Sequence, residues 1–250
     1  MKRLLVILLI CISANVNAQN SELTSALQLK ADKKWKEAFD GFSKLLKTDS
    51  TNIEYLTSTA YLYCKLGNLK TVESERQAYF NQALYLAKKA AALNPNSAQA
   101  HYNIALALGR INEHASNKQK ISNAKVIKSE CDQAVKLDPK LAGAFHILGR
   151  WHRTIAGFNF IEKAMINTLF GGVPEGGSYE AAIDNFSKAI LLEPNEIVHK
   201  FELAETYRER GNEGDDIKAK VWYKKVLEMK AADDDDRVFQ EKARKLVSSK

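Results

Sequence analysis

The chain has 250 residues, of which 45% are hydrophobic and 27% are charged, with only four prolines and twelve glycines. This length allows one or two domains with a sizeable core, and the scarcity of helix-breaking residues favours an all-α fold. The formal net charge of +7 is spread along the chain without the Lys/Arg block of a nucleic-acid-binding arm, so we expect no nucleic-acid partner.

Residues 1–18 have the three parts of a secretory signal peptide. Lys2 and Arg3 precede a short apolar run, and Val16 and Ala18 stand at the two positions that a signal peptidase reads. The run falls far short of the ~20 residues that span a bilayer, which disfavours the alternative of a membrane anchor. We therefore expect cleavage after Ala18, export to the periplasm or the outer envelope, and no transmembrane segment in the mature chain.

Five segments of the remaining chain share one register. Each has a small or branched residue, a second residue four positions later, and a helix-ending residue eight positions after that. In three segments this last residue is proline, which stops a helix because it lacks the amide proton and crowds the preceding turn. The five triplets are Ala38/Phe42/Ser50, Ala83/Ala87/Pro95, Ile127/Cys131/Pro139, Ala182/Phe186/Pro194 and Ala219/Tyr223/Ala231.

A second register follows four of these helix ends. Its four members are Leu56/Thr59/Ala60/Tyr63, His101/Ile104/Ala105/Leu108, Phe145/Leu148/Gly149/His152 and Lys200/Leu203/Ala204/Tyr207. Together the two registers resemble the tetratricopeptide repeat, a helix-turn-helix unit of about 34 residues. The resemblance implies a tetratricopeptide-type α-α superhelix, or solenoid, in one domain over residues 19–250. The predicted helix pairs lie at roughly 20–50, 53–95, 98–139, 142–194 and 197–231.

The spacing between repeats is irregular. The second residues of the five triplets lie at positions 42, 87, 131, 186 and 223, so the steps are 45, 44, 55 and 37 residues. These steps exceed the ~34 residues of the standard repeat. Because each first helix keeps its offset from the preceding helix end, the additional residues lie between the first and second helices. We therefore expect extended or inserted helices within the repeats.

The fourth repeat has the largest number of residues beyond the standard repeat length. There, residues 150–170 extend its first helix or add another helix. Four apolar residues fall on one helical face, and we expect this stripe to pack against neighbouring long helices; the alternative is an exposed stripe that binds a partner or a membrane. The stripe consists of Phe158, Ile161, Met165 and Leu169.

Two local patterns follow the fourth repeat's first helix. The segment "GGVPEGGS" makes a turn, with Ser178 as the N-cap of the next helix. No lysine follows its last glycine, which excludes a phosphate-binding loop. Further on, the helix over 234–248 has an apolar stripe and a charged opposite face, as expected of a solenoid's terminal cap. Asp233–Asp236 suit its N-terminus better than a calcium loop.

The region 148–226 resembles the regulator of microtubule dynamics family, tetratricopeptide proteins known in animals and also found in bacteria. The residues that carry this resemblance are Gly149, Arg150, Trp151, Glu162, Lys163, Leu169, Phe170, Pro174, Tyr179, Ala182, Phe186, Ala189, Pro194 and Trp222. Animal members are associated with mitochondria and microtubules. The resemblance implies a helical scaffold, and it offers a cytoskeletal or microtubule-associated regulator as the alternative to an exported binding protein.

No catalytic or metal-binding pattern stands out in the sequence. The five histidines lack the spacing of a metal motif, and no serine or cysteine lies in a nucleophile motif. We expect no enzyme, no metal and no cofactor; the remaining alternative is a hydrolase or transferase that uses a basic groove. Cys64 and Cys131 fall in helical patterns of different repeats, so we expect buried thiols rather than a disulfide.

The tetratricopeptide resemblance implies a concave groove lined by the first helices. Its middle is basic with aromatic residues interleaved, a combination that suits carboxylates because guanidinium groups bind them bidentately. We expect a non-catalytic scaffold that binds a protein or an extended acidic peptide there; the alternative is a merely solvated polar face. The predicted binding residues are Tyr61, Lys65, Tyr102, Asn103, Arg110, His146, Arg150, Arg153 and Arg208, with Cys64, Leu106 and Glu205 beside them.

Overall fold

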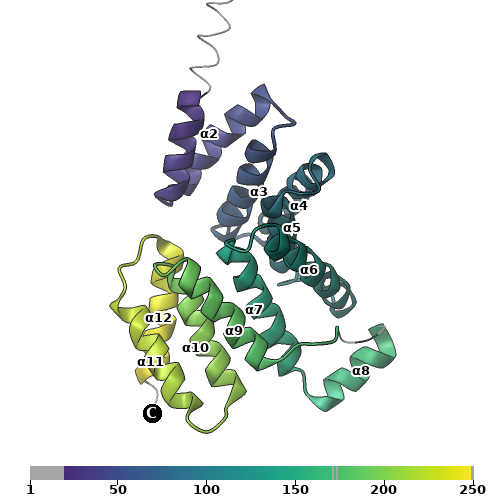
Figure 1. Ribbon diagram of the computed structural model, residues 1–250, viewed down its shortest axis with the longest axis vertical. Helices are drawn as coiled ribbons and strands as arrows, with labels where there is room; N and C mark the ends of the chain where they lie inside the picture. Colours follow the sequence, from purple (N-terminus) through teal and green to yellow (C-terminus); the bar gives the residue numbers. More distant parts are fainter. Residues whose placement is uncertain (1–19, 171, 173, 249–250) are drawn as a thin grey trace, which may run out of the picture. The chain divides into compact units, whose positions relative to one another are not determined.

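The computed structural model describes residues 20–170, 172 and 174–248, and the regular secondary structure of this part is helical, without strands (Figure 1). The predicted signal peptide lies outside the described residues. No helix within these limits combines the length and the apolar character that crossing a membrane requires. The chain divides into two compact units, one ending at Pro95 and the other beginning at Asn96. Each is considered by itself, and the prediction of a single domain over 19–250 stays a prediction.

The first unit contains the first two predicted helix pairs. Its helices are residues 20–31, α2 (Trp35–Thr48), α3 (Ile53–Asn68) and α4 (Glu73–Leu93). Consecutive helices α2, α3 and α4 pack against one another. The predicted Ala38 and Phe42 are fully buried in the cluster that α2 and α3 share.

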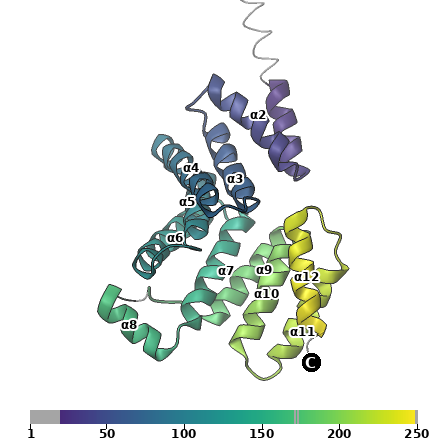
Figure 2. The same ribbon diagram turned by 180° about the vertical axis from the view of Figure 1, so that it is seen from behind.

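The second unit contains the other three pairs and the cap. Its helices are α5 (Ala98–Ile111), α6 (Asn117–Leu137), α7 (Ala142–Gly157), α8 (Phe160–Phe170), α9 (Tyr179–Leu192), α10 (Ile197–Arg210), α11 (Asp215–Glu228) and α12 (Asp234–Ser248). The first helix of each pair contacts its own second helix, and α5, α7 and α10 contact one another in succession. Figure 2 shows this order from behind, with α12 beside α10 and α11. The predicted helix-pair pattern is confirmed.

The small residues of the repeat register allow close helix packing, as the sequence predicts. Phe186 of α9 is fully buried, and a Cβ atom placed on Gly149 of α7 would lie only 2.8 Å from its ring. Real Cβ contacts do not come so close, so a side chain at this position would push α7 and α9 apart. Ala182 and Ala189 are fully buried on the same face of α9.

The irregular spacing is explained by longer and additional helices. The second helices α4 and α6 have 21 residues each, against 14 in α2, α9 and α11. At ~1.5 Å per residue, seven more residues lengthen a helix by roughly 10 Å. In the fourth repeat the chain instead turns at Phe158 and forms the separate helix α8 before α9 begins. Both expected devices, extension and insertion, are present.

The predicted caps are confirmed. The hydroxyl of Ser178 accepts a hydrogen bond from the backbone N–H of Ala181 at 3.1 Å. At the start of α12, Asp233 accepts one from the N–H of Asp236 at 2.9 Å, and these acidic residues suit the positive end of the helix. The stripe of α12 packs on the core that it shares with α10 and α11, through Phe239, Ala243 and Leu246.

The predicted packing of the inserted stripe is wrong. Ile161 is 75% exposed and Met165 is 51% exposed, and their neighbour Phe160 is 85% exposed, whereas Ile166 is buried. Figures 1 and 2 both show α8 standing apart from the other helices of its unit. Phe158, at the turn, is half-buried, and the side chain of Leu169 lies outside the described residues. The described part of the stripe on this helix is therefore exposed, and binding of a partner or a membrane by it stays a prediction.

The cysteine prediction is confirmed. Cys64 and Cys131 are buried thiols, and neither forms a disulfide. Burial raises the pKa of the Cys131 thiol, with the negative charges of Asp132 and Glu130 adding to the effect. The thiolate is therefore strongly disfavoured, which makes Cys131 a packing residue rather than a nucleophile.

Candidate functional site

The two predicted binding residues of the first unit, Tyr61 and Lys65, are on α3 and face α2. The Lys65 ammonium lies 4.8 Å from the centroid of the Trp35 ring and 5.8 Å from that of Tyr61. The two rings meet edge to face with centroids 6.0 Å apart. Lys30 also lies over Tyr61, at 5.3 Å. Cation–π and edge-to-face contacts therefore hold both predicted residues within this unit.

The three predicted residues of α5 have different environments. Tyr102 packs against Gly143 of α7, where a Cβ atom would lie 2.7 Å from its ring. Asn103 is only 1% exposed and belongs to the core, so its placement on a binding surface is wrong. Arg110 is part-buried, and its Nη1 lies 3.2 Å from a carboxylate oxygen of Glu113.

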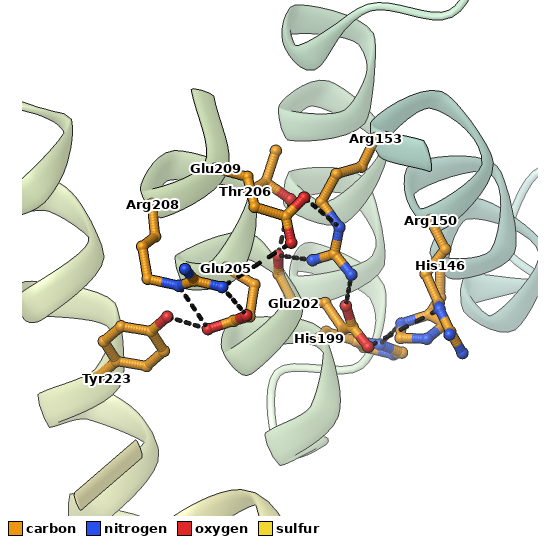
Figure 3. A network of polar contacts seen from close by, with 10 residues as sticks. All are labelled: His146, Arg150, Arg153, His199, Glu202, Glu205, Thr206, Arg208, Glu209 and Tyr223. Carbon is orange, nitrogen blue, oxygen red and sulfur yellow. Dashed lines mark hydrogen bonds and ion pairs between the residues drawn. The ribbon is translucent and has the colours of Figure 1, made fainter. Parts of the chain in front are cut away.

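A polar network joins α7 to α10, and its central residue is Arg153 (Figure 3). The Arg153 Nη2 lies 2.5 Å from Oε2 of Glu202, and its Nε lies 3.5 Å from Oε2 of Glu209. Its Nη1 also donates a hydrogen bond to the backbone carbonyl of Glu202 at 3.1 Å. The side chains of Arg153 and Glu202 are only 14% and 9% exposed. Arg153 therefore fixes α7 to α10. The sequence prediction that Arg153 binds a partner is wrong, because its guanidinium group is already engaged within the protein.

The network continues around Glu205 on α10. Arg208 holds this carboxylate in a fork, with Nη2 at 2.6 Å and Nε at 3.2 Å, and the hydroxyl of Tyr223 on α11 donates to it as well. Burial alone would raise the pKa of Glu205, but the hydrogen bonds from Arg208 and Tyr223 outweigh it and lower the pKa. Burial, followed by the bond to Glu205, raises the pKa of Tyr223. Glu205 thus stays charged and Tyr223 stays protonated near neutral pH.

Two arginines at opposite ends of this network remain half-exposed (Figure 3). Arg150 is 46% exposed, with its Nε 3.8 Å from Oε1 of Glu202, and Arg208 is 47% exposed. Both retain N–H groups that face solvent. We refer to the side chains of Arg150 and Arg208 as the candidate binding face.

The third part of the network is a pair of imidazoles. Nδ1 of His146 on α7 lies 2.9 Å from Nδ1 of His199 on α10, and Nε2 of His199 lies 3.3 Å from a carboxylate oxygen of Glu193. His199 is buried and His146 is largely covered, packing edge-on against Phe186. Desolvation, followed by the positive charges of His199 and the nearby arginines, lowers the pKa of His146 well below its ordinary value. Below, the α7–α10 seam means His146, Arg150 and Arg153 with His199, Glu202 and Glu209.

The sequence prediction missed the acidic half of the seam. It identified Arg110, Arg150, Arg153 and Arg208, but each of these has a glutamate beside it, so the face is less basic than the sequence suggests. A signal was present: residues 202, 205 and 209 on α10 have the i, i+3, i+7 spacing of one helical stripe. Residues 146, 150 and 153 form the matching stripe on α7. The residues missed are Glu113, His199, Glu202, Glu209 and Tyr223.

The charged groups of the network hold helices together. Within residues 20–170, 172 and 174–248, no group of three or more His, Cys, Asp or Glu side chains is placed to hold a metal ion. The carboxylates of Glu202 and Glu205 are bound by guanidinium groups, which keeps them from acting as free bases.

Comparison with known proteins assigns the family. The model of the family "Regulator of microtubule dynamics protein 1-3" matches residues 22–250. Regulator of microtubule dynamics protein 1 of Bos taurus is 30% identical over 178 residues, which cover 71% of this chain and 55% of that protein. The Homo sapiens protein of the same name is 29% identical over 181 residues, 72% of this chain and 56% of that protein. The chain therefore spans about half the length of these relatives.

Comparison with solved structures assigns the fold. The tetratricopeptide protein TTC0263 of Thermus thermophilus superposes with a TM-score of 0.63, at 21% identity, over 90% of this chain and 98% of that one. At this identity the likeness establishes the fold alone, which agrees with the fold predicted from the two sequence registers. The chain belongs to the regulator of microtubule dynamics 1–3 family and has a tetratricopeptide-type helical fold.

Proposed function

We propose that this protein is a non-catalytic scaffold that binds an acidic segment of a protein partner through the candidate binding face. Tetratricopeptide-type helix pairs are suited to this role because they place side chains of successive first helices at fixed spacings. The observation that carries the proposal is the pair of half-exposed guanidinium groups, Arg150 and Arg208, at the two ends of the network.

The physical argument is one of preorganisation. Arg208 is already held in a fork by Glu205, and Arg150 is on the helix that Arg153 fixes to α10. A partner carboxylate that meets these groups finds them in place, so less side-chain entropy is lost on binding. Because both arginines have a glutamate nearby, the face attracts carboxylates locally rather than through a strong general field.

A binding experiment with matched variants tests this face. The probe is a fluorescein-labelled peptide of alternating Glu and Gly with a free C-terminus, and the reference is the same peptide with Lys in place of Glu. The test variant combines Arg150→Glu with Arg208→Gln. The control combines Lys220→Glu with Lys224→Gln, which changes the charge by the same amount at two exposed positions of α11.

We expect the test variant to bind the acidic peptide at least tenfold more weakly than the wild type, a difference of about 1.4 kcal/mol. The control should stay within twofold, and fluorescence anisotropy measures both. Equal affinity of the test variant and the wild type would remove the face from consideration, and equal affinity for the two peptides would contradict an acidic partner. Far-ultraviolet circular dichroism verifies that each variant is folded.

Export is a separate part of the proposal. The features of residues 1–18 support a cleaved signal peptide and a place in the periplasm or the outer envelope. N-terminal sequencing of the protein from its native cells should then begin at Gln19. A start at Met1 would contradict export.

The family assignment supports a second candidate function. The relatives that match over about 70% of this chain are named regulators of microtubule dynamics, so a cytoskeletal role is the alternative. Co-sedimentation with polymerised tubulin tests it directly. Binding to the polymer together with an intact N-terminus would favour the cytoskeletal regulator, whereas a mature N-terminus at Gln19 would favour the exported scaffold.

A further inference from the structure

The imidazole pair of the α7–α10 seam joins two neighbouring repeats through a single hydrogen bond. Nδ1 of His146 and Nδ1 of His199 are 2.9 Å apart, and the ring centroids are 4.9 Å apart. A distance of this kind between two ring nitrogens requires a proton on one of them and a lone pair on the other. The number of protons on the pair therefore decides whether the contact attracts or repels.

The partners of His199 limit the possible protonation states. Its Nε2 faces the Glu193 carboxylate at 3.3 Å, and a carboxylate accepts a hydrogen bond, so Nε2 carries a proton. If His199 is neutral, its Nδ1 is an acceptor and His146 donates. If His199 is charged, its Nδ1 donates to a neutral His146. Either state keeps the bond, but when both rings are charged two N–H groups point at each other.

The charges around the pair come from four helices. Arg110 of α5 and Arg150 and Arg153 of α7 act on His146, and all three disfavour a positive imidazole. Glu193, at the end of α9, faces His199, and Glu202 of α10 is bound by Arg150 and Arg153.

Two further cations on the neighbouring helices face other rings. Lys188 of α9 lies over Phe145, and Lys128 of α6 lies over Trp151. The environment of the pair thus offers one carboxylate to His199 and an excess of positive charge to His146.

We propose that the His146–His199 pair is a proton-sensitive latch. It holds α7 against α10 while no more than one of the two rings is charged, and it releases the two helices when both rings are charged. The latch does not depend on the identity of any binding partner. It adjoins one arginine of the candidate binding face, because His146 and Arg150 are one helical turn apart on α7. Acidification would therefore loosen the support of that face.

The direction of the pH effect follows from linkage. In the unfolded chain His146 has an ordinary pKa of about 6.5, whereas the folded seam lowers its pKa. Below pH ~6.5 the unfolded state thus binds a proton that the folded state excludes, so stability is lost as the pH falls. The loss continues until the pH reaches the lowered pKa of the folded state. For one proton the unfolding equilibrium constant rises by less than tenfold over the first pH unit below ~6.5, and the rise approaches about tenfold per pH unit further below.

Urea unfolding of the full chain at pH 7.5, 6.5 and 5.5 tests the latch. The variant His146→Gln keeps a polar side chain but cannot take the second proton, and His114→Gln removes an exposed histidine as the matched control. Between pH 6.5 and 5.5 the unfolding constant of the wild type and of the control should rise about fivefold more than that of His146→Gln, because about half of the unfolded chains already carry the proton at pH 6.5. A rise of equal size in all three proteins would overturn the proposal.

Two further measurements locate the effect and do not rely on one variant. The amide protection of α7 and α10 should fall more between pH 7.5 and 5.5 in the wild type than in His146→Gln, and an equal fall in both would contradict a latch at this seam. In the wild type, the imidazole NMR signals of His146 should remain those of a neutral ring well below pH 6.5. Ordinary titration of His146 with its helices still protected would overturn the proposal even if the variant failed to fold.

Discussion

The helices α8 and α9 follow each other in the chain and both have apolar residues, yet the apolar residues of α9 are largely buried and several of those in α8 are exposed. In α9, Phe186 is fully buried between α7 and α10, where it meets Gly149 and His146. In α8, Ile161 is 75% exposed, and among residues 160–168, whose side chains the structure describes, only Ile166 is buried. The difference is that α9 packs against a neighbouring helix with a small residue, Gly149, which leaves room for the Phe186 ring. An apolar stripe therefore predicts a helix, but burial also requires a complementary neighbour.

The largest expected effect concerns the buried side of this comparison. Phe186→Ala removes a ring that fills the space between α7 and α10, and it should lower the free energy of unfolding by about 3–5 kcal/mol. Leu191→Ala on the same helix is the matched control, because Leu191 is 81% exposed, and it should change stability by less than about 0.5 kcal/mol. Urea unfolding measures both values. Similar losses in the two variants would contradict the packing of α9.

The smallest expected effect concerns the exposed side. Ile161→Ser should leave the free energy of unfolding within about 0.5 kcal/mol of the wild type, because its side chain gains little burial in α8. Ile166→Ser, five residues further along, should cost about 1–3 kcal/mol or release α8 to proteolysis, since the side chain of Ile166 is buried. If Ile161→Ser proved the more harmful of the two, α8 would have to pack by the face that the structure leaves exposed.

Much of the fold could be predicted from the residues because the repeat imposes local rules. The prolines at 95, 139 and 194 end helices, and Ala182 and Phe186 recur at the spacing of one buried face. The steps between repeats predicted extended or inserted helices, and the structure contains both, as the longer α4 and α6 and as the separate α8 before α9. These features depend on residues close together in sequence, where periodicity and caps carry the information.

The candidate site was only partly predictable because its contacts join distant residues. The repeat register placed His146, Arg150 and Arg153 on one stripe of α7, but it did not tell which residues of α10 lie opposite. Glu202 is 49 residues from Arg153, and the pairing depends on how far α10 is displaced along α7. The same register also placed Asn103 on the surface, although it is buried. Residue spacing along one helix indicates which side chains share a face. Which residues of another helix lie opposite them is decided by how the two helices pack.

The ion pair between Arg153 and Glu202 tests the central claim, that a buried polar seam fixes α7 to α10. The experiment is a double-mutant cycle with Arg153→Met, Glu202→Leu and both together, read by urea unfolding. Each single change should cost about 2–3 kcal/mol because it leaves a buried charge without its main partner, whereas the double variant should recover at least about 2 kcal/mol of the summed loss. Losses that add to within about 0.5 kcal/mol would show that the two side chains do not hold the helices together.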